Sequence, residues 1–313
     1  MFSFTSDYTT KEKAVFGEVS YLLTDQLEAT FGARYSDYDL TTEQTASGFV
    51  TLFIPVQEIP PAGDSKTTFK GVLSYRPNDN AMIYARAAQG YRIGNSNPTV
   101  PDPTSPLTYG PDNLWSYELG AKTAWLDGDL ILNGAVYYID WEDMQLTLTS
   151  ELGFPYQDNA GNTRSIGAEV EADARLGEYF SYSVGAAFTD ATIRVDNASL
   201  GAMAGDRVPG VAKVTFSQAG TFTYPFTSKL EGYARVDHQF VGGSSSSFNQ
   251  AAAVPMGDYH LVNMRAGARF EGWDASIFVT NIFDEDAIMT ALSAAAQYQL
   301  RPRTIGLNVR ASF

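Results

Sequence analysis

The chain has 313 residues, a formal net charge of -15 at pH 7 and no cysteine. This acidic balance argues against a nucleic-acid partner, because phosphate binding needs clustered lysine and arginine. The absence of cysteine excludes disulfides and thiolate metal sites, and no apolar run approaches the roughly 18 residues of a transmembrane helix. The length allows one large domain or two ordinary ones.

Apolar and polar residues alternate along most of the chain. A period of two places the apolar residues on one face of a strand and the polar residues on the other. The clearest strands are expected at about 12–23, 27–35, 166–176, 180–188, 262–270 and 305–313, and we expect roughly thirteen strands in all. Helical periodicity is nearly absent, and only Ala287–Gln297 is expected to form a short helix inside a loop.

Short turns and long connections follow each other in strict alternation. Short turns are expected near residues 24–26, 77–80, 127–129, 177–178, 225–228 and 271–272. Long stretches rich in Pro, Gly, Ser and Asn lie at about 41–65, 93–112, 150–157, 195–208, 242–256 and 284–299. Outer-membrane barrels have short periplasmic turns and long extracellular loops, whereas a soluble meander has no reason to segregate its loop lengths. The sequence therefore predicts an all-β, antiparallel up-and-down transmembrane β-barrel of about 13–14 strands.

The expected strand count is odd, whereas bacterial single-chain barrels have an even number of strands. One explanation is that Phe2–Tyr8 forms a strand of its own before the first clear one. The other is that the chain is a piece cut inside an extracellular loop. We favour the second explanation, because an open sheet edge in lipid would leave unpaired backbone groups that cost several kcal/mol each.

The last thirteen residues, Arg301–Phe313, read RPRTIGLNVRASF. Apolar residues alternate with polar ones from Ile305 to the terminal aromatic, which fits a strand with one face toward lipid and the other toward a lumen. A soluble edge strand is the alternative for this segment alone. The ending also resembles the C-terminal strand of TonB-dependent outer-membrane receptors, with Arg301, Pro302 and Phe313 as its signature.

Further segments are similar to the same family in chain order. They are Tyr84–Arg92, Leu114–Leu126, Asn133–Trp141, Asn159–Glu171, Gly205–Gly210 and Thr280–Asp284. The resemblance implies that residues 1–313 form the C-terminal portion of a 22-stranded barrel. The family's signal peptide, TonB box and plug domain have no counterpart in the sequence, and the N-terminal segment lacks the pattern of an export signal.

The same resemblance implies what the intact receptor does and where it acts. It would take up a scarce ligand, an iron–siderophore complex, cobalamin or a glycan, across the cell outer membrane of a Gram-negative bacterium. Its expected partners are outer-membrane lipid, the barrel assembly machinery through the C-terminal strand, the small-molecule ligand, and TonB only through the missing plug. We expect no enzyme activity and no cofactor.

Candidate site residues fall into two groups, in the loops and on the polar faces of the strands. The candidates for ligand-facing loop positions are Tyr91, Arg92, Asn95 and Tyr109, although an interface girdle beside a solvated loop would also explain them. The expected lumen charge network is Glu118, Lys122, Glu169, Glu171, Asp173, Arg265, Arg269 and Arg310, with the arginines balancing the carboxylates.

The sequence gives little support for catalytic or metal-binding chemistry. The acidic run from Glu169 to Asp173 could suggest a glycosidase pair, but balanced lumen charges explain it more simply. His238 and His260 are the only histidines, and His238 is expected near the end of an outward strand without a catalytic role. No spacing typical of a metal site is present, so no metal is expected. Two alternatives to the receptor remain, a plug-less passive outer-membrane pore and a soluble β-sandwich that acts as a binding module or carbohydrate enzyme.

Overall fold

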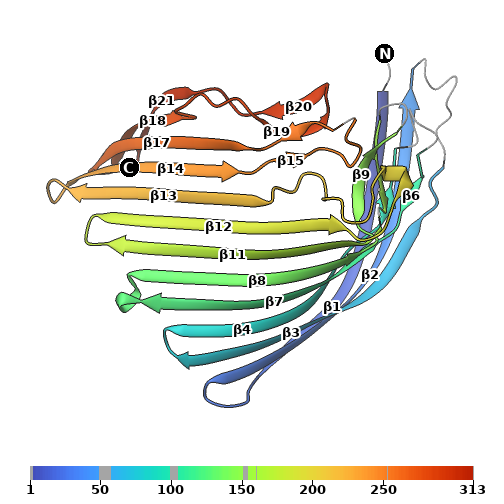
Figure 1. Ribbon diagram of the computed structural model, residues 1–313, viewed down its shortest axis with the longest axis horizontal. Helices are drawn as coiled ribbons and strands as arrows, with labels where there is room; N and C mark the ends of the chain where they lie inside the picture. Colours follow the sequence, from blue (N-terminus) through green and yellow to red (C-terminus); the bar gives the residue numbers. More distant parts are fainter. Residues whose placement is uncertain are drawn as a thin grey trace.

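The computed structural model describes residues 3–48, 58–98, 105–150, 154–159, 161–251 and 253–312. Thirteen strands form one antiparallel sheet, which bends into a deep trough (Figure 1). In sheet order they are β1 (Ser3–Leu22), β2 (Leu27–Ser47), β3 (Ala62–Asn78), β4 (Ala81–Arg92), β7 (Asp112–Trp125), β8 (Leu130–Glu142), β11 (Thr163–Leu176), β12 (Phe180–Ile193), β13 (Val214–Pro225), β14 (Leu230–Val241), β17 (Tyr259–Phe270), β18 (Trp273–Thr280) and β21 (Thr304–Ala311). The all-β antiparallel architecture and the count of thirteen strands are confirmed.

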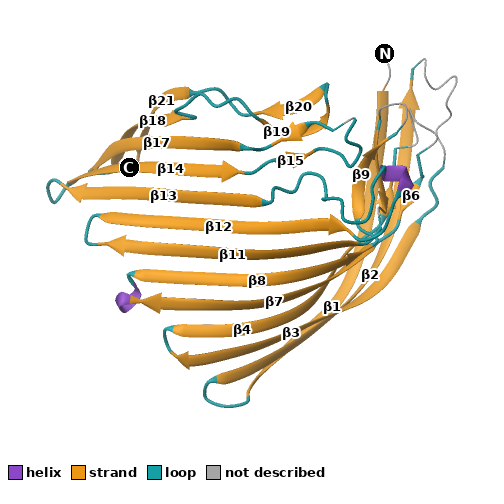
Figure 2. Cartoon of the chain, in the orientation of Figure 1, coloured by secondary structure: helices purple, strands orange, loops and turns teal. Residues whose placement is uncertain are grey.

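The two ends of the strands differ as the loop lengths predict. At one end, tight turns join the two strands of each hairpin; at the other, long loops carry small hairpins of their own (Figures 1 and 2). These loop hairpins are β5 (Asn95–Ser96) with β6 (Thr108–Tyr109), β9 (Gln145–Thr149) with β10 (Pro155–Asn159), β15 (Ser244–Ser245) with β16 (Pro255–Met256), and β19 (Ile288–Ser293) with β20 (Ala296–Gln299). We call the two sides the short-turn end and the long-loop end.

Two local expectations and one alternative from the sequence are wrong. Residues 3–8 belong to β1, which pairs with β2 without interruption from Ser3 to Leu22, so they form no separate strand. The expected helix at Ala287–Gln297 is instead the β19–β20 hairpin, because a helix that short is marginal in water and the hairpin pairs the backbone groups. The expected long loop from residue 41 to 65 is partly strand, since β2 continues to Ser47 and β3 begins at Ala62.

The only helices in the described residues are two short 3-10 turns, η2 (Leu126–Gly128) and η3 (Ala198–Leu200) (Figure 2). None of the helices in this part of the chain is long and apolar enough to span a membrane.

The sheet has one apolar and one polar face. Apolar side chains on the outward face are largely exposed, with Leu307 at 80% and Val19 at 71% of their full surface. The opposite face carries most of the charges, and antiparallel neighbours on it form ion pairs such as Arg34–Glu12 and Arg269–Glu231. This is the arrangement of a barrel wall with a lipid side and a lumen side.

Because the main sheet is single, the alternative of a two-layer soluble sandwich is wrong: its apolar face has no second large sheet packed on it in the described residues. β1 and β21 are the two edges of the sheet, and the described residues contain no pairing between them. Phe313 lies outside the described residues.

Buried apolar residues gather beneath the long loops rather than along the sheet. One cluster contains Ile193, Ala202 and Phe248, and a second contains Val254, Met256 and Ala291. We call these two groups the apolar loop clusters. They give the long-loop end a packed layer of its own.

Candidate functional site

A group of polar side chains ties the loops together at the long-loop end. We call it the polar loop network, and its members are Arg92, Asn97, Asp112, Gln145, Gln157 and Asn159. They come from the end of β4, the β4–β7 loop, the start of β7 and the β9–β10 hairpin. Loops far apart in sequence are thereby fixed side by side.

Asp112 is the centre of this network, and its side chain is only 1% exposed. Antiparallel pairing of β4 with β7 sets it opposite Arg92, whose guanidinium donates from Nε at 2.9 Å and also from Nη2. The same carboxylate accepts from the Arg92 backbone N–H at 3.2 Å and from the Gln145 backbone N–H at 3.0 Å. Such a buried carboxylate is stable because its lone pairs are satisfied by charged and backbone donors.

Arg92 also lies over the Trp141 ring, with 4.8 Å between the guanidinium carbon and the ring centroid. Its Nη2 donates to the Gln145 carbonyl at 3.0 Å. The Gln145 side chain in turn donates to the carbonyls of Ile93 and Gly110. Through these contacts the loop after β4 is bound to the loop after β8.

Asn97 fastens the same two loops at a second point and is 2% exposed. Its side-chain amide donates to the carbonyls of Pro106 at 2.9 Å and Gln157 at 2.7 Å, while its oxygen accepts from the Gln157 N–H at 2.8 Å. Gln44, near the end of β2, donates to the Asn97 carbonyl at 2.9 Å. The last residues of β2 thus support the loops at the long-loop end.

Gly94 allows the loop to fold back closely on itself. A Cβ at this position would overlap the carbonyl oxygen of Tyr109, so only glycine fits without movement. The Gly94 N–H donates to the Tyr38 hydroxyl at 3.3 Å. This close approach brings Asn95 opposite Tyr109 in the β5–β6 pair.

The four loop candidates from the sequence occupy different environments. Tyr91 and Arg92 are neighbours on β4 and lie on opposite faces, so they do not act as one surface. Arg92 is engaged by Asp112, as described above. Asn95 uses its side-chain oxygen to accept from the Ser96 N–H at 2.7 Å. Burial raises the pKa of the Tyr109 hydroxyl, Tyr8 adds to this shift, and the positive charge of Arg92 opposes it.

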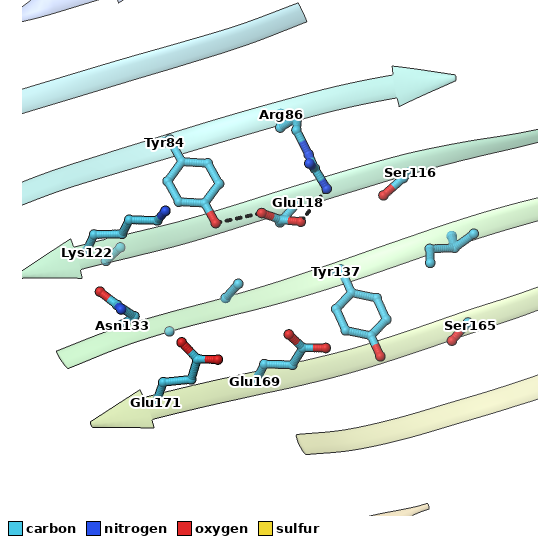
Figure 3. Close-up of a pocket in the computed structure, with 14 residues that line it drawn as sticks. Tyr84, Arg86, Ser116, Glu118, Lys122, Asn133, Tyr137, Ser165, Glu169 and Glu171 are labelled. Atoms are coloured by element: carbon cyan, nitrogen blue, oxygen red, sulfur yellow. Dashed lines mark hydrogen bonds and ion pairs between the residues drawn. The ribbon is translucent and has the colours of Figure 1, made fainter. Parts of the chain in front are cut away.

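A second polar feature lies on the inner face of the sheet. A hollow of about 420 Å³ is lined by polar and charged side chains from β4, β7, β8 and β11 (Figure 3). Glu118 accepts from the Tyr84 hydroxyl at 2.6 Å and from Arg86 Nη2 at 2.7 Å. Lys122 and Glu171 are both register partners of Asn133, from its two neighbouring strands.

The carboxylates of Glu169 and Glu171 point into this hollow (Figure 3). Neither has an ion-pair partner among the described residues. Asp173, the third acid of the strand, accepts from the Ser183 hydroxyl at 2.5 Å. The structure therefore brings Glu118, Lys122, Glu169 and Glu171 into one hollow and leaves two of their carboxylates open.

The arginines expected to balance these acids lie elsewhere. Arg269 pairs with Glu231 at 2.6 Å and with Asp274 at 3.4 Å. Arg310 is the register partner of Asp274, and Arg265 lies over the Phe278 ring. Strands β12, β13 and β14 separate β11 from β17, so these arginines lie apart from Glu169 and Glu171. Arg269 and Arg310 lie opposite acids of their own neighbouring strands, whereas Arg265 lies opposite Arg235.

The C-terminal signature residues act through their backbone groups. The carbonyl of Arg301 accepts from the Asn281 side chain at 3.0 Å, and the carbonyl of Pro302 accepts from the Thr304 hydroxyl at 3.1 Å. Asn281 is 2% exposed and also binds Glu285, so it fixes the entry into β21. No group of three or more potential metal ligands occurs in the described parts of the chain.

The chain is similar to proteins of a known family. Residues 2–282 match the family model for the β-barrel of TonB-dependent receptors, described as "TonB dependent receptor-like, beta-barrel". The pesticin receptor of Yersinia pestis is 26% identical over 327 residues, which cover 99% of this chain and 45% of the receptor. A pesticin receptor of Yersinia enterocolitica is equally similar.

Solved structures show the same relationship. The ferric yersiniabactin uptake receptor of Yersinia pestis superposes with a TM-score of 0.82 at 25% identity, over 100% of this chain and 47% of the receptor. The ferric-catecholate import receptor of Escherichia coli K12 shares the fold, with a TM-score of 0.72 at 19% identity over 98% of this chain and 45% of the receptor. The chain spans about half the length of the relatives that it matches. Since the family model covers most of its residues, the chain belongs to the TonB-dependent receptor β-barrel family.

Proposed function

We propose that residues 1–313 form the C-terminal portion of the 22-stranded barrel of a receptor that takes up a ferric siderophore across the outer membrane of a Gram-negative bacterium. Siderophore receptors recur among the similar proteins, including the ferric yersiniabactin and ferric-catecholate receptors. The observation that carries the proposal is the polar loop network, which fixes two long loops at one end of a lipid-compatible wall.

Each part of the wall has its own task in this proposal. The outward apolar face contacts outer-membrane lipid, and the inner charged face lines a water-filled lumen. The polar loop network holds the loops in one geometry, so that a ligand meets a preformed surface. Asn95 and Tyr109 are the candidates for ligand contact there, whereas Tyr91 lies on the outward face of β4. Arg92 has a positioning role, because Asp112 and Trp141 already engage its guanidinium.

The lumen charge network is part of the same proposal. Glu169 and Glu171 present open carboxylates to the lumen, whereas Glu118 is held by Tyr84 and Arg86. Arg265, Arg269 and Arg310 belong to a separate charged group near β18. TonB would act through a plug domain, and the barrel assembly machinery would engage β21. The wall does no covalent chemistry of its own.

The proposal is tested by uptake of ferric siderophores labelled with radioactive iron. A strain that lacks the gene should lose energy-dependent uptake of one siderophore class, and the gene on a plasmid should restore it. Ferric yersiniabactin, a ferric catecholate and ferric pyoverdine are suitable probes, because receptors for these ligands share the fold. Uptake of none of them, in cells whose outer membrane contains the protein, would contradict the proposal. Solute uptake that persists in a strain without TonB would favour the passive pore instead.

A further inference from the structure

Four aromatic side chains on the inner face of the sheet lie over glycines of the neighbouring strand. The register sets each aromatic directly opposite its glycine, and a Cβ added at that glycine would overlap the aromatic ring. The pairs are Tyr84–Gly120 (β4–β7), Tyr137–Gly167 (β8–β11), Tyr233–Gly267 (β14–β17) and Phe278–Gly306 (β18–β21). Tyr84 and Tyr137 stand in the hollow described above (Figure 3). Each ring therefore occupies the space that the glycine leaves free.

All four pairs join strands that are connected by a long loop. Among the described residues, no hairpin with a short turn sets an aromatic opposite a glycine on the inner face. Two of the long-loop connections, β2–β3 and β12–β13, also lack such a pair in this part of the chain. A tight turn fixes the register of the strands that it joins, whereas a long loop leaves their register open. The aromatic–glycine pairs thus occur where the connection does not set the register.

The hydroxyls of two of these tyrosines reach a third strand. Tyr137 crosses Gly167 on β11, and its hydroxyl forms a 2.8 Å hydrogen bond with the Thr189 hydroxyl on β12. Tyr233 crosses the glycine of β17 in the same way and donates to Asp274 on β18 at 2.8 Å. Since β11–β12 and β17–β18 are hairpins with short turns, each tyrosine connects the last strand of one hairpin to both strands of the next.

A shifted register would leave no open glycine under the rings. A slip of one residue turns the apolar face of a strand inward, but a slip of two residues keeps both faces in place and is not excluded by the apolar pattern. The inner-face residues two positions from each glycine carry side chains that fill the same space. They are Glu118 and Lys122 beside Gly120, Ser165 and Glu169 beside Gly167, Arg265 and Arg269 beside Gly267, and Thr304 and Asn308 beside Gly306. A two-residue slip in either direction therefore displaces every ring.

We propose that Tyr84, Tyr137 and Tyr233, which we call the bridging tyrosines, set the register between successive hairpins while the barrel wall forms. In this role the ring of each tyrosine packs on its glycine before the next hairpin is fully paired, so its contacts form early in folding. The inference concerns assembly of the wall. It is independent of the ligand that the receptor takes up.

Refolding of the full-length receptor from urea into lipid vesicles, followed by the gel mobility of folded and unfolded protein, tests this role. Tyr137→Ala should slow folding about tenfold, the combined size of one cross-strand aromatic contact and one hydrogen bond. The unfolding rate should change much less, because a contact that forms early acts mainly on the folding rate. Tyr138→Ala is the matched control, since it removes the next aromatic of β8, on the outward face opposite Ile166. It should slow folding far less.

Engineered cysteines report the register directly, because this chain has no cysteine of its own. Val136 lies opposite Ala168, and a slip of two residues brings it opposite Ile166 or Val170. In the native register these diagonal positions are about 7–8 Å apart, beyond the reach of a disulfide. Cysteine pairs at Val136 and Val170, or at Val136 and Ile166, should cross-link during refolding of Tyr137→Ala about ten times as often as when Tyr137 is present.

The outcomes separate a role in register from a role in stability alone. Slower folding of Tyr137→Ala without slipped cross-links would overturn the proposal, and so would equal slowing by Tyr138→Ala. Faster unfolding with an unchanged folding rate would also overturn it. Because the cross-links form during refolding, they report the register even if Tyr137→Ala does not complete folding. Tyr137→Phe keeps the ring over Gly167 and should give an intermediate folding rate with few slipped cross-links.

Discussion

The long loops fall into two groups that are held together by different forces. The loops after β4 and β8 are joined by the polar loop network, with Asp112 at 1% exposure and Asn97 at 2%. The loops after β12, β14 and β18 are joined by the apolar loop clusters around Phe248 and Met256. Leu146 on β9 packs against the first cluster and connects the two groups.

The two kinds of interaction constrain the loops to different degrees. Hydrogen bonds hold their partners at a set distance and angle, whereas apolar packing tolerates small shifts. The first group therefore presents one defined surface, as a ligand site needs. The second group stabilises the rim without specifying it to the same degree. Substitutions in the polar loop network should therefore mainly weaken ligand binding. Substitutions in the apolar loop clusters should mainly lower local stability.

The largest change in stability is expected for Phe248→Ala. Phe248 is 7% exposed and packs with Ile193 and Ala202, so loss of its ring leaves a cavity. We expect a local cost of about 3 kcal/mol. Amide hydrogen exchange should become faster in the loops after β12 and β14 and change little in the loop after β4.

Phe283→Ala is the matched control, because Phe283 is 71% exposed and should be neutral. If Phe248→Ala speeds exchange in the loop after β4 as strongly as in its own loops, the two groups are one cooperative unit and the comparison fails.

Asp112→Asn should have the next largest effect on stability and the largest on ligand binding. The change removes the charge that pairs with Arg92, and an asparagine cannot accept from all of its present donors. We expect a loss of about 2 kcal/mol, lower than for a fully buried pair because Arg92 remains 46% exposed. Siderophore affinity, measured by fluorescence quenching, should fall at least tenfold.

Asp143→Asn is the control for this change, since Asp143 lies in the neighbouring loop and asparagine tolerates its positive φ of 52°. Equal siderophore affinity in Asp112→Asn and Asp143→Asn would mean that the polar loop network does not position the ligand surface.

Much of the fold could be predicted from sequence because its signals are local. A period of two and the alternation of loop lengths require no knowledge of tertiary contacts. They were sufficient for the thirteen strands and for the apolar face of β21. The extensions of β2 and β3 were missed because Thr41–Ser47 is almost wholly polar and shows no alternation. In the proposed barrel those residues would pair outside the membrane, where no face has to be apolar.

The site was harder to predict because it depends on register. Asp112 and Asn97 look like ordinary loop residues, yet they are among the most buried side chains. One signal could have found Asp112: the expected pairing of two adjacent strands sets an acid at the start of one opposite an arginine at the end of the other. His238 and His260 are 22 residues apart, and only the register of β14 with β17 brings them together.

Gly94→Ala tests whether the polar loop network needs close approach of the backbone. The added methyl group would overlap the Tyr109 carbonyl, so the β5–β6 pair must open. We expect a cost of about 1 kcal/mol, because a surface hairpin can shift to relieve the overlap. Amide exchange should rise at Asn97 and stay unchanged at the apolar loop clusters. Gly71→Ala, on β3 with open space around it and, like Gly94, without a positive φ, controls for the added methyl group itself. Equal protection of Asn97 in both variants would show that this close approach is dispensable.

The smallest effect is a dependence on alkaline pH at Tyr109. Burial raises the pKa of this hydroxyl above its value in an unfolded chain, which is about 10. Since the folded loop favours the protonated form, that contribution is fully present below the unfolded pKa and is lost as pH rises through the folded value. Limited proteolysis should therefore cut the loop after β4 faster above about pH 10 than at pH 8.

In Tyr109→Phe, which cannot ionise, the increase should be smaller, while cutting at the apolar loop clusters should respond equally in both proteins. An identical pH response of the two proteins at the β4–β7 loop would contradict this prediction. It would mean that the loop accommodates the ionised Tyr109 side chain despite its burial.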